Sequence, residues 1–225
     1  MSSPITLAGI TAPDSAYTRK AAALVAQVHD KAMLNHVQRS WWFADAIGRK
    51  RGMAFDREVV YLAAILHDLG LTEAYMTDQR FEVDGANAAR ALLLGDAYPE
   101  GKAQQVWDAI ALHSAIGVAE YMGPEIALVH MGSHLDVLGM FVDDVSPAII
   151  DDTLQLYPRL GFSAAFQAAL AESVRRNPIR AAGTGLVDIG HRHVHGFALP
   201  NGCDLLDHSL LETWPGSRAE GIVAA

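Results

Sequence analysis

Cysteine is almost absent from this chain of 225 residues, in which Cys203 is the only one. An intrachain disulfide needs two cysteines and a cysteine-based metal cluster needs several, so the sequence excludes both. Chains without disulfides are typical of reducing compartments. We therefore expect a cytoplasmic protein.

The chain also lacks long apolar runs and an excess of basic charge. No segment approaches the roughly eighteen apolar residues that a membrane-spanning helix needs, and the N-terminal "MSSPITLAGITAPDS" lacks the basic start and apolar stretch of a secretory signal. Acidic residues outnumber Lys and Arg by 26 to 17, which gives a formal net charge of −9 at pH 7. Such a chain repels nucleic acid and anionic membranes on average, so we expect neither as a partner.

What the sequence does contain is the composition of a folded domain, with 51% hydrophobic and 19% charged residues. Apolar residues return at steps of three and four from about residue 15 to 177, which predicts an all-α fold. Asp14 or Ser15 and then Asp56 are expected N-caps, and Gly70 is the expected left-handed C-cap of the third helix. The pattern places helices at about 15–30, 33–50, 56–69, 85–94, 101–114, 124–142, 147–155 and 161–176.

Beyond about residue 180 the helical period stops and Gly, Pro and His become frequent. We predict one helical domain over 1–180, with an irregular C-terminal extension, 181–225, that packs on it. Trp214 and the leucines in 205–211 favour packing, because exposing them would be unfavourable. A strand-like alternation of His191, His193 and His195 suits metal ligands, but a flexible surface segment is the stronger expectation.

A histidine-aspartate doublet follows directly on an apolar run in "AAILHDLGLTEAY". Burying the ionised carboxylate of Asp68 beside His67 costs several kcal/mol or more unless it is paired or bound to a metal. The chain has a second doublet, His29 and Asp30, which Lys31 follows at once. We interpret this second doublet as a solvated helix face.

Metal sites in helical proteins are built from several facing helices. His36 lies on the predicted second helix, His67 and Asp68 end the third, and Asp136 lies on the helix over 124–142. This pattern resembles the HD superfamily of metal-dependent hydrolases. The order and spacing of five blocks over about 33–170 resemble its cyanamide hydratase-like branch: "LNHVQRSWWFADAIG", "YLAAILHDLGLTEAYMTDQRFEVDGANAARALL", "AIALHSAIGVA", "LVHMGSHLDVLG" and "YPRLGFSAAF".

The resemblance implies an HD-domain helical bundle that binds one divalent ion. The implied ligands are His36, His67, Asp68 and Asp136, and the implied ion is zinc, with Fe, Mn, Ni and Co left open. Phe81 stands where two-metal members carry a histidine, which favours a single ion. Three further histidines keep a second ion open: His113, His130 and His134.

The predicted catalytic residues are Asp68, which would share a proton while ligating, together with His113 and Glu73. His113 either serves the substrate or is a core histidine, and Ser114 stands where related hydratases often have a glutamate. Glu73 and Asp84 either line the pocket or accept a hydrogen bond from ligand histidines, or else each is a helix-cap or turn residue. The aromatic run Trp41–Phe43 is interpreted mainly as core.

The predicted reaction is attack of metal-bound hydroxide on a small nitrile-type substrate, as in the conversion of cyanamide to urea. The alternative is a phosphohydrolase, for which Arg39, Arg80 and Arg90 lie near the motifs, although no glycine-rich phosphate cradle is visible. A non-catalytic binding module is a third possibility. Apolar helix faces would also support a homo-oligomer.

Overall fold

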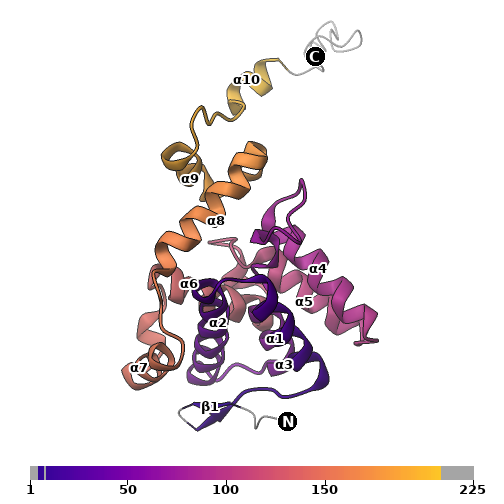
Figure 1. Cartoon of the computed structure of the whole chain (residues 1–225), viewed down its shortest axis with the longest axis vertical. Coiled ribbons are helices and arrows are strands. Elements are labelled where there is room, and N and C mark those ends of the chain that lie inside the picture. The colour runs from indigo at the N-terminus through magenta and orange to yellow at the C-terminus, as the bar shows by residue number, and fades with distance from the viewer. Residues whose placement is uncertain (1–4, 8, 209–225) are drawn as a thin grey trace, which may run out of the picture.

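Helices make up almost all of the regular structure in the computed structural model, which describes residues 5–7 and 9–208 (Figure 1). The all-α prediction is confirmed. A short antiparallel hairpin of β1 (Thr6–Leu7) and β2 (Ile10–Thr11) precedes the helices. The helices are α1 (Ala16–Val28), α2 (Lys31–Lys50), α3 (Arg57–Leu66), α4 (Phe81–Gly95), α5 (Glu100–Leu112), α6 (Pro124–Leu138), α7 (Pro147–Leu156), α8 (Phe162–Arg176), α9 (Leu186–His193) and α10 (Gly202–Asp207). Four 3₁₀ turns connect them: η1 (Leu69–Leu71), η2 (Ala119–Tyr121), η3 (Val142–Asp144) and η4 (Pro178–Ala181).

The first three helices begin at polar side chains that accept bonds from the first helical turn. Ser15 caps α1 through a capping box, in which its Oγ accepts from the Thr18 amide and Thr18 Oγ1 accepts from the Ser15 amide. Asp30 caps α2 and Asp56 caps α3 with a carboxylate oxygen that accepts from backbone amides of the first turn. These caps set where α2 and α3 start, and so the positions of the site residues along them.

The third helix ends earlier than its sequence predicts. Regular α-helix stops at Leu66, and Leu69–Leu71 form η1. Gly70 is not a left-handed C-cap, because it is not among the residues with positive φ. A Cβ at Gly70 would lie 2.0 Å from the backbone oxygen of Phe81. The glycine is therefore needed for the close approach of α4.

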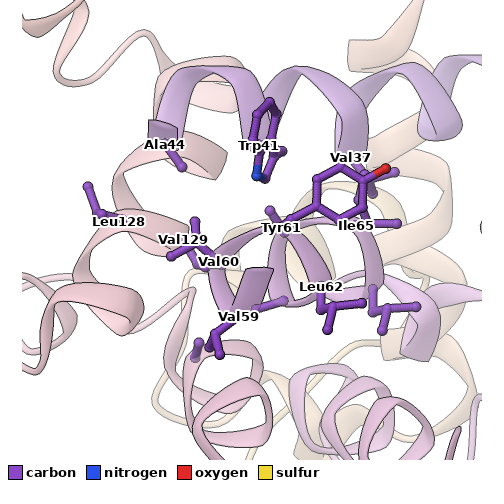
Figure 2. Packing of buried hydrophobic residues seen from close by; sticks show 14 of the residues in the cluster. Val37, Trp41, Ala44, Val59, Val60, Tyr61, Leu62, Ile65, Leu128 and Val129 are labelled. Atoms are coloured by element: carbon purple, nitrogen blue, oxygen red, sulfur yellow. The ribbon is translucent and has the colours of Figure 1, made fainter. Parts of the chain in front are cut away.

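The core is centred on α2, which is buried on nearly every side. Figure 2 shows Val37 and Trp41 of α2 directly above Tyr61 and Ile65 of α3. The ring centroids of Trp41 and Tyr61 are 5.3 Å apart in an edge-on arrangement. Trp41, Trp42 and Phe43 are all buried, which confirms their interpretation as core. A helix that is buried on most faces lies at the centre of a bundle, and α2 therefore brings buried polar residues such as His36 and Arg39 into the interior.

A second apolar cluster joins the chain after α7 to the bundle. Phe162 and Leu170 of α8 pack with Leu186 of α9 and Phe81 of α4. In Figure 1, α8 leads away from the bundle and carries α9 and α10 at the far end. No helix among the described residues combines the length and apolarity needed to cross a bilayer.

The segment after residue 180 is less irregular than its composition predicts, since it forms α9 and α10. His191 and His193 lie on the exposed side of a helix, not on a strand. The part that packs is α9, whereas Leu205 and Leu206 of α10 are exposed. Trp214 lies outside the described residues.

Candidate metal centre

Three buried side chains point their ligand atoms at one place in the bundle. His36 Nε2 lies 3.2 Å from His67 Nε2. Asp68 Oδ2 lies 3.4 Å from His36 Nε2 and 3.3 Å from His67 Nε2. The three residues are each at most 1% exposed, and one ligand atom from each falls within 4.8 Å of the others.

The backbone at the end of α3 explains how two consecutive residues reach the same point. His67 keeps helical dihedrals, but Asp68 turns to φ −98° and ψ 12°. Neighbouring side chains on a regular helix diverge by about 100°. Because the chain leaves the helical path at Asp68, the carboxylate of Asp68 and the ring of His67 are not held 100° apart. Both side chains therefore reach His36 on α2.

Hydrogen bonds on the far sides of the two rings orient their lone pairs. His36 Nδ1 bonds to Asp136 Oδ2 at 2.7 Å, and His67 Nδ1 bonds to the backbone oxygen of Ala64 at 2.8 Å. Both acceptors require a proton on Nδ1, so each neutral ring carries its lone pair on Nε2. Two lone pairs 3.2 Å apart beside a carboxylate repel one another, and a cation between them removes that repulsion.

The carboxylate of Asp68 is the second sign of a cation site. It is completely buried, and neither oxygen accepts a hydrogen bond from the described residues. Burial alone would raise the pKa of Asp68, but the positive charge that the adjacent His67 and His36 rings carry when they are protonated holds this pKa well below its usual value. A buried, ionised carboxylate without donors is unfavourable unless a cation binds it. Two imidazoles and one carboxylate are a donor set that suits a divalent transition metal.

Asp136, the predicted fourth ligand, is not brought into this cluster. Its Oδ2 accepts from His36 Nδ1 and from Arg39 Nη2, and its Oδ1 accepts from Arg39 Nε at 2.6 Å and Arg159 Nη1 at 3.1 Å. These bonds occupy both oxygens on the side of the His36 ring away from Nε2. In this structure Asp136 orients His36, and its role as a fourth ligand of the ion stays a prediction.

Arg39 holds the carboxylate of Asp136 beside Nδ1 of His36. It lies one turn after His36 on α2, is completely buried and meets Asp136 through two parallel bonds. Burial alone would raise the pKa of Asp136, but His36 and Arg39 lower it below its usual value. The carboxylate thus stays ionised and keeps the proton of His36 on Nδ1.

A cavity of about 420 Å³ opens above the two ligand histidines. Residues of α4, α6, α8 and α9 form its walls. Its lining is mainly apolar or aromatic and includes Phe81, Ile116, Val137, Leu138, Phe162, Phe166, Leu170, Leu186 and Ile189. The cluster therefore lies at the bottom of a pocket that a small organic molecule can enter.

Two other histidines of the cavity lining, His113 and His134, offer hydrogen-bond acceptors. His113 Nδ1 donates to the backbone oxygen of Ile110 at 2.7 Å, and His134 Nδ1 donates to that of His130 at 3.0 Å. Burial lowers the pKa of each ring to about 4, so both are neutral at pH 7. Each Nε2 is then a hydrogen-bond acceptor. The predicted site residue His113 is thus near the cluster, with its ring centroid 4.7 Å from that of His67.

The other predicted residues fall elsewhere. Glu73 is exposed on the loop after η1 and does not line the cavity, so the structure does not bring it to the site. Asp84 is buried and accepts from the amide and hydroxyl of Thr77, which makes it a turn residue. His130 Nδ1 donates to the backbone oxygen of His113, and His130 Nε2 lies 3.3 Å from Glu120 Oε1. Among the described residues, the only cluster of three or more ligand side chains is that of His36, His67 and Asp68.

Glu82 is a buried carboxylate that the sequence reasoning missed. It accepts from the hydroxyl of Ser114 and from Arg80 Nη2 at 2.7 Å. Burial alone would raise the pKa of Glu82, but Arg80 and His113 lower it. The carboxylate of Glu82, which α4 carries, thus lies beside Ser114. Its position in the first turn of a helix, next to Phe81, was the available signal.

The burial of His29 was also missed, because we interpreted the doublet of His29 and Asp30 as a solvated helix face. Asp30 is exposed and caps α2, as a solvated residue would. His29 is half-buried, and its buried Nε2 has no hydrogen-bond partner among the described residues. Burial lowers its pKa to about 4. The two neighbours thus differ: Asp30 is an exposed helix cap, whereas His29 directs its Nε2 into the protein.

Comparison with known proteins agrees with this geometry. A family model described as "HD domain" matches residues 33–141, the segment that carries every residue of the cluster. This segment is therefore similar to an HD domain. Two similar proteins are the cyanamide hydratases DDI2 and DDI3 of Saccharomyces cerevisiae, each 25% identical over 183 residues. The matched segment covers 79% of this chain and 81% of each yeast protein. The chain is thus similar to the cyanamide hydratase-like branch, and the HD-domain match supports a metal-dependent hydrolase.

Proposed function

We propose that this protein is a zinc-dependent hydratase of small nitrile-type molecules. The observation that carries the proposal is the convergence of His36 Nε2, His67 Nε2 and Asp68 Oδ2 at the floor of a mainly apolar cavity. Three protein ligands with an open position are typical of catalytic zinc. The similarity to two cyanamide hydratases supports the choice of reaction.

A divalent ion held by these residues would act as a Lewis acid and lower the pKa of a water molecule from about 15.7 toward 7. Asp68, with its other oxygen free of hydrogen bonds, is able to accept a proton from that water. His113 and His134 present neutral Nε2 acceptors, which would hold the amino group of cyanamide or the protons of water. Water adds across the carbon–nitrogen triple bond: the oxygen bonds to carbon, the nitrogen gains a proton, and tautomerisation gives an amide, or urea from cyanamide.

The alternative, a phosphohydrolase, receives less support from the side chains. Arg39 is bound to Asp136, Arg80 to Glu82, and Arg90 lies 3.5 Å from Glu100, so none of the three is directed to the cavity. Of the described arginines, only Arg192 lines the cavity. A site whose histidines are acceptors suits a neutral substrate and its attacking water better than an anion, which needs donors.

The test is metal content by elemental analysis, combined with a urea assay on cyanamide before and after chelation. We expect about one equivalent of zinc per chain and urea formation that stops on chelation and returns with added zinc. Stoichiometric metal without turnover of cyanamide or any other nitrile, together with hydrolysis of phosphate esters, would replace this proposal by the phosphohydrolase. A protein that retains no divalent metal would contradict the metal centre itself.

A further inference from the structure

The cavity is far larger than cyanamide requires. Its volume is about 420 Å³, within the range of roughly 300–1,000 Å³ that holds larger organic ligands. Cyanamide has three non-hydrogen atoms, and a water molecule occupies about 30 Å³ in the liquid. A substrate of that size would leave most of the cavity to water, against apolar walls.

Aromatic side chains extend from the ligand cluster toward the outer wall. The ring of Phe162 stacks on His36, with centroids 4.5 Å apart and planes 21° apart. Phe166 stacks on Phe162 in turn, with centroids 5.2 Å apart. Leu170 of the same helix and Ile189 of α9 continue this wall. The apolar surface therefore begins at the metal ligands themselves and continues outward along α8.

Polar side chains lie at the outer rim, where Asp188, Arg192 and His193 of α9 line the cavity and are exposed. The pocket thus has hydrogen-bond acceptors at its floor, an apolar middle and a charged rim. Burial of apolar substrate surface in the middle contributes about 25 cal/mol per Å². This contribution is absent for cyanamide.

We infer that the preferred substrate is a nitrile bearing an aromatic or branched aliphatic group, which lies against Phe162, Phe166 and Ile189 while the nitrile faces His36 and His67. The inference rests on the proposed hydratase activity. It deepens that proposal by naming the body of the substrate, which neither the ligand cluster nor the yeast relatives specify.

The test compares kcat/KM for phenylacetonitrile, acetonitrile and cyanamide on the zinc-loaded full chain. We expect phenylacetonitrile to exceed the other two by at least tenfold. The Ile189→Trp variant fills the apolar middle and should lower the ratio of phenylacetonitrile to cyanamide turnover at least tenfold. The matched control is Ile179→Trp, which makes the same change at an exposed residue of η4 outside the cavity lining and should leave the ratio as it is. Equal or better turnover of cyanamide would overturn the inference and leave the hydratase proposal intact.

Binding without turnover separates the two proposals if no nitrile is hydrated. Isothermal titration with phenylacetamide, the corresponding product amide, then reports on the apolar middle alone. Binding in the wild type and in Ile179→Trp, with at least tenfold loss in Ile189→Trp, would support recognition of an aromatic body although the hydratase activity had failed. Absence of binding in all three proteins would overturn the inference as well.

Discussion

Asp68 and Asp136 are two buried carboxylates with opposite surroundings. Asp68 receives no hydrogen bond from the described residues, whereas Asp136 accepts from His36, Arg39 and Arg159. One carboxylate is therefore available to a cation, and the other is already neutralised by arginine. Substitution of each by the uncharged isostere asparagine distinguishes a ligand from a residue that positions a ligand.

We expect Asp68→Asn to lose the metal while keeping the fold. Bound metal should fall from about one equivalent to less than a tenth, because the only anionic ligand of the cluster is gone. The melting temperature of the metal-free protein should change little, since no hydrogen bond within the described chain is lost. Elemental analysis and calorimetry check both parts, and retention of full metal content would show that Asp68 is not a ligand.

Asp136→Asn should behave in the reverse way. It leaves the guanidinium of Arg39 buried without its full partner, and breaking such a pair costs roughly 3–5 kcal/mol. Metal affinity should fall about 10- to 100-fold because His36 loses the acceptor that orients it, but binding should persist. Urea denaturation and metal titration test this, with the exposed Asp143→Asn as the matched control. Complete loss of metal at unchanged stability would identify Asp136 as a ligand.

The predicted site residues that the structure brings together are those whose chemistry is local. His67 and Asp68 follow one another on an apolar run, and the HD-like context pointed to His36, so these three were found. The role of Asp136 depends on Arg39, which is 97 positions away along the chain and bonds to it only in the fold. Glu73 was predicted to line the pocket or hold a ligand histidine, but on the loop after η1 it is exposed.

At the scale of elements, the position of Asp68 depends on how closely α4 lies against the turn after α3. A Cβ at Gly85 would lie 2.8 Å from the backbone oxygen of His67, and a Cβ at Gly70 would lie even closer to that of Phe81. Two glycines thus let backbone meet backbone at the residues that carry the ligands. A methyl group here has no flexible side chain to displace, so the helix itself must move.

Gly85→Ala is therefore expected to damage both stability and metal binding. Overpacking of this kind typically costs about 1–3 kcal/mol, and displacement of His67 should lower metal affinity at least tenfold. The control is Gly95→Ala on the same helix, where an added Cβ meets nothing within 4 Å. That variant should be neutral or slightly more stable. Equal behaviour of the two variants in denaturation and metal titration would contradict the close approach.

The elements themselves were largely predictable, because N-caps and apolar periodicity are local signals. Ser15 and Asp56 cap α1 and α3 as predicted, whereas Asp30, which caps α2, was expected within the end of the first helix. The end of α3 and the existence of α9 were not predictable in this way. Both depend on packing, of α4 against Gly70 in the first case and of Leu186 against α8 in the second.

At the scale of the whole molecule, burial of neutral histidines links the fold to pH. His29, His113 and His134 each have a pKa lowered to about 4 by burial, from an ordinary value of 6.5. For His36 burial acts in the same direction, but Asp136 and Asp68 raise its pKa. Near pH 5 the unfolded chain therefore binds up to three protons that the folded chain does not, while His36 is protonated in both.

We expect the free energy of unfolding of the chelated protein to decrease as the pH falls from about 6.5 toward 4. The three lowered histidines stabilise the fold fully above pH 6.5, and their contribution is lost as pH falls toward their folded pKa values, because stability rises with pH wherever the unfolded state binds more protons. Just above pH 6.5 the raised pKa of His36 acts in the opposite direction.

Urea denaturation between pH 7.5 and 4.5 should give a slope of one to three protons near pH 5. His134→Asn, whose amide is able to donate to the backbone oxygen of His130 in place of Nδ1, should reduce that slope by about one proton. A flat profile from pH 6.5 to 5 would mean that these histidines are solvated in the folded protein.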